Sequence, residues 1–331
     1  MRILVIGGAG YIGSHMSIML HDAGHEVVVF DNLSTGRRDA VICAGFIQGD
    51  LSNKSEINAV LSTEEFDAVM HFSSSSIVSE SVKDPSKYYR NNFSNTQNLI
   101  DSMLANGVRH LVFSSSAAIF GEPKYVPIDE NHPKMPVNPY GRSKLMVEDM
   151  LADYDDAYGL KSVCFRYFNA AGADPLCRTG ESHEPETHLI PLALQAASGR
   201  SNGLFVYGRD YSTLDGTCIR DYIHVMDLCK AHLLGLHWLN DRRESRAFNL
   251  GSGHGFSVRQ VIEIAERVTG KTIPVTYRPR RHGDPAILVS DSSLAKLELG
   301  WSPEFMGMET MIAHAWQWEC KRSRFYEPLR I

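Results

Sequence analysis

The first half of the chain alternates short apolar runs with amphipathic stretches. Apolar runs typical of buried strands occupy residues 2–7, 26–31, 66–72, 110–115 and 162–168. Helical patterns lie between these runs, near residues 11–23, 53–63, 86–106 and 140–157. Solid apolar strands that alternate with helices are typical of a parallel sheet covered on both faces. The sequence therefore predicts an α/β fold with a doubly wound, Rossmann-type parallel sheet.

After about residue 170 the pattern becomes irregular. Gly, Pro and charged residues surround short expected elements near 189–199, 204–207, 257–269 and 306–320. We predict a nucleotide-binding Rossmann domain over residues 1–170 and a smaller α/β domain over residues 171–331. Apolar segments near 213–250 are expected to return to the first domain, so that the two domains are interleaved.

Composition narrows the class of protein. A chain of 331 residues is long enough to bury a large core. Its net charge of −6 and its scattered Lys and Arg residues argue weakly against nucleic acid as the main partner, and none is expected. The six cysteines form no CxxC pair, which is typical of free thiols in a reducing compartment. The opening "MRILVIGG" enters a strand pattern directly, and no run is apolar enough to span a bilayer. We expect a cytoplasmic protein with no membrane partner.

A glycine-rich turn follows the first predicted strand. Gly7, Gly10 and Gly13 form a GxxGxxG pattern before a helix, and Asp31 ends the second strand. Such glycines let the backbone approach a pyrophosphate at a helix N-terminus, where amide donors and the helix dipole favour anions. Asp31 can accept a hydrogen bond from a ribose hydroxyl and would repel a 2′-phosphate, which favours NAD over NADP. A nucleotide-free Rossmann-like domain is the alternative. Asp50 follows the next strand and serves either to contact adenine or to cap a helix.

The segment "NPYGRSK" places Tyr140 four positions before Lys144. On a helix these positions share a face, so the ammonium group can favour the phenolate. Ser116 comes shortly after the strand 110–115, at the sheet edge where doubly wound folds bind ligands. Together the three side chains form an acid–base set in which Tyr140 exchanges the proton and Lys144 lowers its pKa. A nearby nicotinamide charge would lower that pKa further. An ordinary surface Tyr/Lys pair is the alternative.

Several motifs occur in a fixed order along the chain: "GGAGYIGSH", "FSSSAAIFG", "NPYGRSKLMVE", "RYFNAAGADP", "ETHLIP", "DGTCIRDYIHVMDL" and "RRHGD". In this order they resemble the extended short-chain dehydrogenase/reductase family, and within it the sugar-nucleotide epimerases. The resemblance runs from residue 1 to about 318. The glycine-rich turn and the YxxxK pair serve the whole superfamily, whereas "RDYIHVMDL" with "RYFNAAG" is much more specific to the epimerases.

The resemblance implies two sets of binding residues beside the acid–base set. For NAD it implies Gly7, Gly10, Tyr11, Ile12, Gly13, Asp31, Asn32, Asp50, Leu51, Phe72, Asn91, Tyr140, Lys144 and Phe168. For the UDP-sugar it implies Ser116, Tyr140, Asn169, His188, Leu189, Phe205, Tyr207, Arg220, Arg281, Asp284 and Leu288. For two residues of the UDP-sugar set, side-chain chemistry supports the same role without the resemblance. The guanidinium groups of Arg220 and Arg281 are suited to bidentate binding of a diphosphate.

The implied reaction is the reversible, NAD-dependent 4-epimerisation of UDP-glucose and UDP-galactose through a 4-keto sugar. An N-acetylated UDP-sugar is an alternative substrate. An NDP-sugar 4,6-dehydratase on the same fold is an alternative activity, but its pattern carries Asp-Glu where this chain has Ala117 and Ala118. Alanines cannot transfer protons, which favours epimerisation. A different class, an NAD-sensing regulator, is disfavoured because such sensors tend to lose the YxxxK pair.

Three further expectations complete the prediction. The chain departs from the family pattern in the serine-rich loop 73–76 and at Ser79. These departures leave the affinity for the cofactor open. The resemblance implies a homodimer formed through the helices near 86–106 and 140–157. His183 and His188 flank Glu184, but this spacing is not a metal-ligand pattern, so no metal is predicted.

Overall fold

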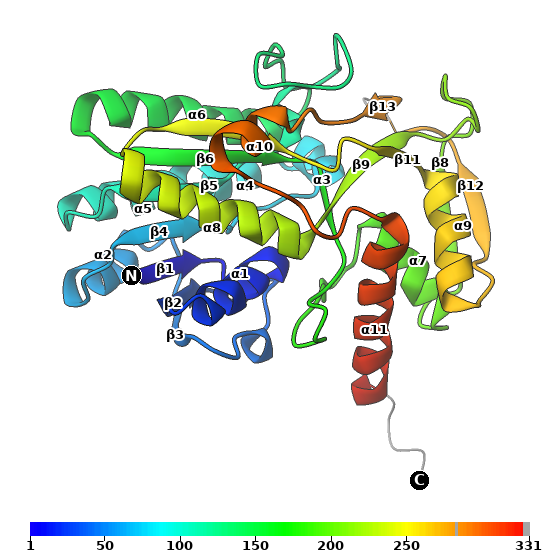
Figure 1. Cartoon of the computed structure of the whole chain (residues 1–331), viewed down its shortest axis with the longest axis horizontal. Coiled ribbons are helices and arrows are strands. Elements are labelled where there is room, and N and C mark those ends of the chain that lie inside the picture. Colours follow the sequence, from blue (N-terminus) through cyan, green and yellow to red (C-terminus); the bar gives the residue numbers. More distant parts are fainter. Residues whose placement is uncertain (282–283, 327–331) are drawn as a thin grey trace.

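The computed structural model describes residues 1–281 and 284–326. Its centre is a seven-stranded sheet in the order β10-β6-β5-β4-β1-β2-β3, in which all neighbouring strands are parallel. The strands are β1 (Arg2–Ile6), β2 (Glu26–Asp31), β3 (Gly45–Gln48), β4 (Ala68–His71), β5 (His110–Ser114), β6 (Lys161–Tyr167) and β10 (Arg246–Leu250). The predicted α/β fold with a Rossmann-type sheet is confirmed (Figure 1).

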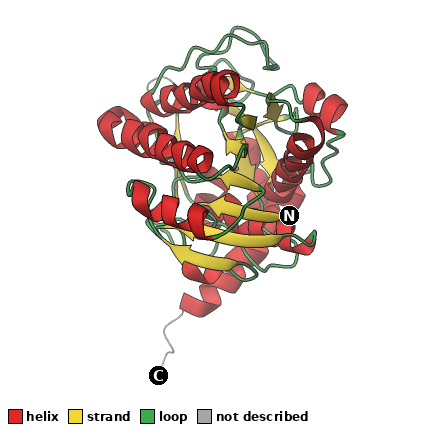
Figure 2. Cartoon of the chain, turned by 90° about the vertical axis from the view of Figure 1, so that its left-hand side faces the viewer, coloured by secondary structure: helices red, strands yellow, loops and turns green. Residues whose placement is uncertain are grey.

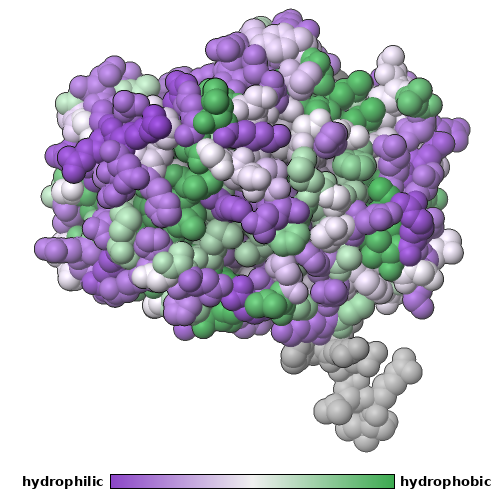
Figure 3. All heavy atoms as spheres, viewed as in Figure 1, coloured by the Kyte–Doolittle hydropathy of each residue, from purple (hydrophilic) through white to green (hydrophobic). Residues whose placement is uncertain are grey.

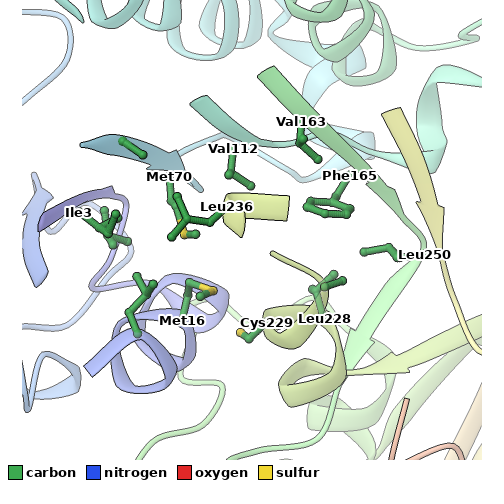
Figure 4. Close-up of a cluster of buried hydrophobic side chains, with 14 of the residues drawn as sticks. Ile3, Met16, Met70, Val112, Val163, Phe165, Leu228, Cys229, Leu236 and Leu250 are labelled. Carbon is green, nitrogen blue, oxygen red and sulfur yellow. The ribbon is translucent and has the colours of Figure 1, made fainter. Parts of the chain in front are cut away.

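Helices cover both faces of this sheet (Figure 2). One face packs against α1 (Tyr11–Asp22) and α8 (Val225–Arg242), and the other against α2 (Lys54–Thr63), α5 (Asn95–Ala105) and α6 (Pro139–Tyr158). Successive side chains of β1 divide between the two cores: Ile3 and Val5 join the first, whereas Leu4 and Ile6 join the second. Because side chains alternate across a strand, a strand buried on both faces is continuously apolar. Figure 4 shows the first core, where Ile3, Met70, Val112 and Phe165 of the sheet face Met16 and Leu228 of the helices.

The helix predicted near 86–106 is interrupted. It consists of α4 (Pro85–Tyr88), a π-helical segment (Tyr89–Ser94) and α5. Single π-helical turns often occur at functional sites. Asn91 and Asn92 lie in this segment. The short helix α3 (Val78–Lys83) precedes it and was not expected from the sequence pattern. Two short 3-10 turns, Arg38–Ala40 and Ala117–Ile119, complete this half of the chain.

The second part of the chain packs at one end of the sheet (Figure 1). Its core is formed by α7 (Leu189–Ala197), α9 (Val258–Thr269) and α11 (Met308–Tyr326), beside the parallel strands β8 (Leu204–Tyr207) and β12 (Val275–Arg278). A small sheet contains β7 (Asn169–Ala171), β9 (Ile219–His224), β11 (Gly255–Ser257) and β13 (Ile287–Leu288). The chain passes from β9 into α8, which lies on the large sheet, and α10 (Ser293–Leu299) contacts α8 and β10. The domain boundary at residue 170 stays a prediction.

Hydrophobic residues on the face in Figure 3 are scattered among hydrophilic ones. Within the described residues, no helix combines the length and apolar character that crossing a bilayer requires.

Buried histidines make the fold sensitive to acid. Burial lowers the pKa of His15 and His232 to about 4 and that of His71 and His224 to about 3. An unfolded histidine binds a proton below about pH 6.5. These histidines therefore contribute stability that is fully present above about pH 6.5 and is lost as the pH falls toward their folded pKa values. We expect the free energy of unfolding to decrease between pH 7 and pH 5 by roughly 1–2 kcal/mol per histidine.

Urea unfolding at the two pH values measures this effect, with His232→Leu as the test variant. Because His232 is fully buried, its removal should reduce the pH dependence, whereas His21→Leu on the surface should not. An unfolding free energy that is equal at pH 5 and pH 7 would contradict the expectation.

Candidate active site

The glycine-rich turn between β1 and α1 is closely packed against its surroundings. Gly7 has a φ of +75°, and a Cβ atom on it would lie 2.6 Å from the backbone nitrogen of Ser73. A Cβ atom on Gly13 would lie 2.2 Å from the carbonyl oxygen of Gly7. Only glycine fits at these two positions, because backbone atoms cannot move aside as a flexible side chain can.

The N-terminus of α1 offers amide donors beside an open space. Helix α1 begins at Tyr11, and its N-cap residue Gly10 provides no side-chain hydrogen bond to the first turn. Gly10 and Tyr11 line a cavity of about 380 Å³. Uncapped amides at a helix N-terminus suit an anionic pyrophosphate. The residues present therefore fit the diphosphate of a dinucleotide.

Asp31 ends β2 next to this turn. Its carboxylate accepts hydrogen bonds from the Ala9 amide at 2.9 Å and the Leu33 amide at 2.8 Å, and the residue is 8% exposed. Burial raises its pKa from the ordinary value, and the two amides oppose that change. The carboxylate is thus fixed at the end of β2, in a position to accept from a ribose hydroxyl.

Asn32 and Asp50 lie together beyond the ends of β2 and β3. The Asn32 amide donates to Asp50 Oδ2 at 2.8 Å, and this hydrogen bond lowers the pKa of Asp50. Asp50 Oδ1 also accepts from the Ser52 amide at 2.7 Å. The N-cap of α2 is Asn53, so Asp50 occupies the turn before the helix and is not its N-cap.

Tyr140, Lys144 and Ser116 come together at the carboxyl ends of β5 and β6. Tyr140 and Lys144 lie in the first turns of α6, whose N-cap Asn138 accepts from the Gly141 amide at 2.9 Å. The Ser116 side chain lies close enough to Tyr140 to lower the pKa of its phenol. Lys144 Nζ donates to the carbonyl of Ser114 at 2.8 Å and lies 4.9 Å from the centre of the Phe113 ring. The three side chains of the predicted acid–base set are thus adjacent.

Burial acts on the pKa values of both Tyr140 and Lys144. In the protein alone, burial raises the pKa of Tyr140 above its ordinary value, and only the hydrogen bond with Ser116 opposes this. Burial also lowers the pKa of Lys144 to about 7, which weakens the ammonium charge that was expected to favour the phenolate. The expectation that Lys144 lowers the pKa of Tyr140 stays a prediction, because in the protein alone desolvation acts in the opposite direction.

The serine-rich loop after β4 is tied to the π-helical segment. The Ser75 amide donates to Asn92 Oδ1 at 2.8 Å, and Asn92 Nδ2 donates back to the Ser75 carbonyl at 2.9 Å. Asn91 Nδ2 contacts Ser75 Oγ at 3.2 Å. Asn92 also donates to Ser143 Oγ on α6 at 3.0 Å. This network connects the loop to the helix that carries Tyr140 and Lys144.

The other residues expected at the cofactor occupy varied positions. Tyr11 donates from its hydroxyl to the Gly172 carbonyl at 2.7 Å, and Ile12 packs against the first core. Leu51 is buried in the second core. Phe72 stacks 5.1 Å from His232, and Phe168 packs beside Ala117, which follows Ser116.

The residues expected at the UDP-sugar form several groups. Arg220 pairs with Asp284 and donates to the Pro285 carbonyl at 2.7 Å. The Arg281 guanidinium lies 4.1 Å from the centre of the Tyr207 ring. Residues 282 and 283 of the "RRHGD" motif lie outside the described residues.

The remaining members of this set lie on β7, β8, β13 and the start of α7. Asn169 donates to the Asp221 carbonyl at 2.9 Å, Phe205 is 51% exposed, and Leu189 begins α7. Leu288 pairs in register with Arg220 and packs against the residues around Phe120. His188 contacts Glu181 at 2.6 Å rather than standing free.

Sequence reasoning missed three features near these groups. Tyr167 is hydrogen-bonded to Ser114. Burial is the main cause that raises the pKa of Tyr167, and the nearby Tyr140 raises it further. Glu148 and Arg166 form a buried ion pair beneath Ser115. A loop also brings Glu181, His183, Glu186 and His188 together. The spacing argument against a metal considered Glu184, which is exposed and lies outside this group.

Fold and site together define a dinucleotide-binding Rossmann protein with a Tyr–Lys–Ser set at the carboxyl edge of its sheet. The sequence matches the NAD dependent epimerase/dehydratase family over residues 3–251. It is 49% identical over 326 residues to the UDP-glucose 4-epimerase of Halalkalibacterium halodurans, with 98% of each chain covered. The protein thus belongs to the NAD dependent epimerase/dehydratase family.

Solved structures agree with this assignment. The chain superimposes on UDP-glucose 4-epimerase from Brucella ovis in complex with NAD with a TM-score of 0.93 at 47% identity, covering 96% of this chain and 97% of that one. It is also similar to the UDP-Glc/GlcNAc 4-epimerase from Campylobacter jejuni, with a TM-score of 0.84 at 44% identity, covering 97% of this chain and 99% of the other.

Proposed function

We propose that this protein catalyses the reversible, NAD-dependent 4-epimerisation of UDP-glucose and UDP-galactose. The single observation that carries the proposal is the contact of Tyr140 with Ser116 beside Lys144, at the end of the sheet where the glycine-rich turn also lies. Relatives such as the Halalkalibacterium halodurans protein bear the name UDP-glucose 4-epimerase along nearly their whole length. The class of enzyme is an isomerase that acts on a sugar nucleotide.

Each residue of the acid–base set has a distinct role in this proposal. Tyr140 takes the proton of the sugar 4′-hydroxyl and later returns it, and Ser116, whose side chain is close to Tyr140, orients that sugar hydroxyl. Lys144 holds the ribose next to the nicotinamide ring. NAD, when bound, supplies reversible acceptance of the C4′ hydride. No net oxidation results, because the hydride returns to the sugar. The cofactor therefore does not need to be exchanged between turnovers and can stay bound.

The UDP part must stay fixed while the hexose turns over. Arg220 and Arg281, placed on β9 and after β12, are proposed to bind the diphosphate, and Tyr207 and Phe205 flank that region on β8. Asp284 holds Arg220 in place by a direct ion pair. Asn169, His188 and Leu189 are proposed to complete the nucleotide contacts.

The 4,6-dehydratase alternative is disfavoured by the residues after Ser116. Eliminating water requires its own acid and base, and Ala117 and Ala118 in the 3-10 turn provide neither. An N-acetylated substrate stays the less favoured alternative: the curated relatives are named UDP-glucose 4-epimerase, although the Campylobacter jejuni protein is described as a UDP-Glc/GlcNAc 4-epimerase. The NAD-sensing regulator is disfavoured because the complete acid–base set is assembled.

Proton NMR of the purified protein with UDP-galactose and no added cofactor tests the proposal. We expect the anomeric signal of UDP-glucose to appear, because the protein retains NAD. If conversion begins only when NAD is added, the serine-rich loop 73–76 holds the cofactor weakly. No conversion with NAD present would contradict the proposed function.

Leu288 is proposed to control access of the hexose. It packs against the buried cluster that contains Ala117, and it pairs in register with Arg220, so it connects the expected catalytic and diphosphate groups. Replacing Leu288 by Tyr should reduce activity on UDP-N-acetylgalactosamine by roughly tenfold or more relative to activity on UDP-galactose, because the larger ring fills the space of the acetyl group. The ratio of the two kcat/KM values measures this. Leu288→Met conserves volume and serves as the control, and equal losses on both substrates would refute this role.

We also propose a cytoplasmic homodimer that pairs through α5 and α6. On α6, Met146 and Tyr158 are 38% and 57% exposed and supply apolar surface away from the sheet. Light scattering on the purified protein tests this state, and a mass of one chain of 37.0 kDa would contradict it.

A further inference from the structure

The loop that precedes α7 gathers four metal-ligating side chains. Glu181, His183, Glu186 and His188 each offer one ligand atom, and these atoms all lie within 4.8 Å of one another. The loop is irregular, so the donors follow no helical or strand spacing in the sequence. We call this group the Glu/His cluster.

The contacts within the Glu/His cluster converge on one oxygen. Glu181 Oε1 lies 2.6 Å from His188 Nδ1 and 3.1 Å from His183 Nδ1. Glu186 Oε1 lies 3.2 Å from the same His188 nitrogen. Two imidazole nitrogens therefore aim at a single carboxylate oxygen, and without a cation each needs a proton to make that contact.

Charge and burial leave this cluster incompletely compensated. The side chains of Glu181 and Glu186 are only 7% and 3% exposed. Glu186 Oε2 is buried and has no hydrogen-bond partner among the described residues. Two ionised carboxylates contribute a charge of −2 within this largely buried pair of side chains. A divalent cation bound by two neutral imidazoles and the two carboxylates would bring the net charge of the cluster to zero. It would also coordinate the carboxylate oxygens directly.

The backbone around the cluster is held in place. Glu186 Oε1 accepts from the Thr187 amide at 2.7 Å and the His188 amide at 2.9 Å. The Trp318 indole donates to the Glu181 carbonyl at 3.0 Å, which ties the loop to α11. His183 also lines the cavity of about 380 Å³ beside the glycine-rich turn, which gives an ion access from solvent.

We propose that the Glu/His cluster binds a divalent transition-metal ion, with Zn²⁺ as the best-suited ion. Two imidazole nitrogens and two carboxylate oxygens form a four-coordinate donor set that Zn²⁺ accepts. His188 would ligate through Nδ1, which faces the carboxylates, and its Nε2 atom stays available for the proposed nucleotide contact. Ligands about 2.0–2.2 Å from Zn²⁺ in tetrahedral geometry lie roughly 3.3–3.6 Å apart. The three short contacts of 2.6–3.2 Å would widen by about 1 Å or less to reach that spacing, and the widest pairs, which extend to 4.8 Å, would narrow by about 1 Å. The bound ion cross-links residues 181–188 between the glycine-rich turn and α7.

Metal binding by protein treated with a chelator tests this site independently of catalysis. The probes are Zn²⁺ in calorimetry and Co²⁺ in visible absorption, with no substrate present. We expect one ion per chain, the d–d bands of four-coordinate Co²⁺, and a higher Tm with Zn²⁺. Affinity should weaken as the pH falls, because protons compete for the imidazoles.

Matched variants locate the ion. His183→Ala and Glu186→Gln should each weaken Zn²⁺ binding at least about tenfold, whereas Glu184→Gln, an exposed neighbour outside the cluster, should leave it unchanged. Far-UV circular dichroism without metal confirms that each variant is folded. Equal affinity for all three variants, a thiolate charge-transfer band that places Co²⁺ on a cysteine, or no binding by the wild type would overturn the proposal.

Discussion

Replacing Tyr140 by Phe is expected to lower kcat for UDP-galactose epimerisation by about 10²–10⁴-fold. The substitution removes only the hydroxyl that exchanges the proton and lies close to Ser116, and it leaves the half-buried ring in place. Since the ring packs 6.3 Å from the Tyr88 ring, the fold should be retained. The rate of UDP-glucose formation and the NAD content of the purified variant are the two measurements.

Tyr154→Phe on the same helix is the matched control. Its hydroxyl donates a hydrogen bond to Asp101 on α5 at 3.0 Å, and the residue lies more than two helical turns from Lys144 on α6. This control should keep wild-type kcat. A Tyr140→Phe variant that keeps wild-type kcat with bound NAD would remove Tyr140 from the proposed mechanism.

Replacing Arg166 by Met is expected to lower the free energy of unfolding by about 3–5 kcal/mol. Arg166 and Glu148 form a bidentate pair with contacts of 3.0 Å and 2.7 Å, and their side chains are 4% and 5% exposed. Burial alone would raise the pKa of Glu148, but Arg166 outweighs it and holds the pKa below its ordinary value. Removing the guanidinium leaves a carboxylate charge buried without its main partner, which is costlier than the net gain from the intact pair.

A double variant distinguishes the cost of leaving one charge unpaired from the cost of lost side-chain packing. Glu148→Met combined with Arg166→Met removes both charges, so urea unfolding should show a recovery of much of the lost stability. Glu148 also accepts a hydrogen bond from Ser115 Oγ at 2.6 Å, and Ser115 precedes Ser116. In the Arg166→Met variant a displaced Glu148 should therefore misplace Ser116 and lower the activity. An Arg166→Met protein within 1 kcal/mol of wild type would contradict this account.

The large sheet could be predicted because its strands are buried on both faces. Ile3 to Ile6 divide between two cores, which makes β1 a continuous apolar run that sequence patterning detects. The short strands β7, β11 and β13 were missed, because two or three residues carry no periodicity. The π-helical segment was read as part of one helix, since its sequence remains compatible with an ordinary helix.

The candidate site was predictable where function depends on a fixed local spacing. Tyr140 and Lys144 share one helix, and Gly7 and Gly13 share one turn, so short motifs identify them. The Glu/His cluster has no such signal, because an irregular loop sets its geometry. The direction of the Tyr140 pKa shift could not be predicted from the sequence. Burial is its largest cause, and burial depends on the whole fold.

The central claim is that the sugar is oxidised and reduced at C4′ by transfer of its own hydride. Epimerisation of UDP-galactose in D₂O, followed by NMR of the UDP-glucose formed, tests this most directly. The account predicts that C4′ of the product keeps its original hydrogen, because only the hydroxyl proton passes through Tyr140 and exchanges with solvent. Deuterium at C4′ of UDP-glucose would show that the carbon itself is deprotonated and would contradict the account.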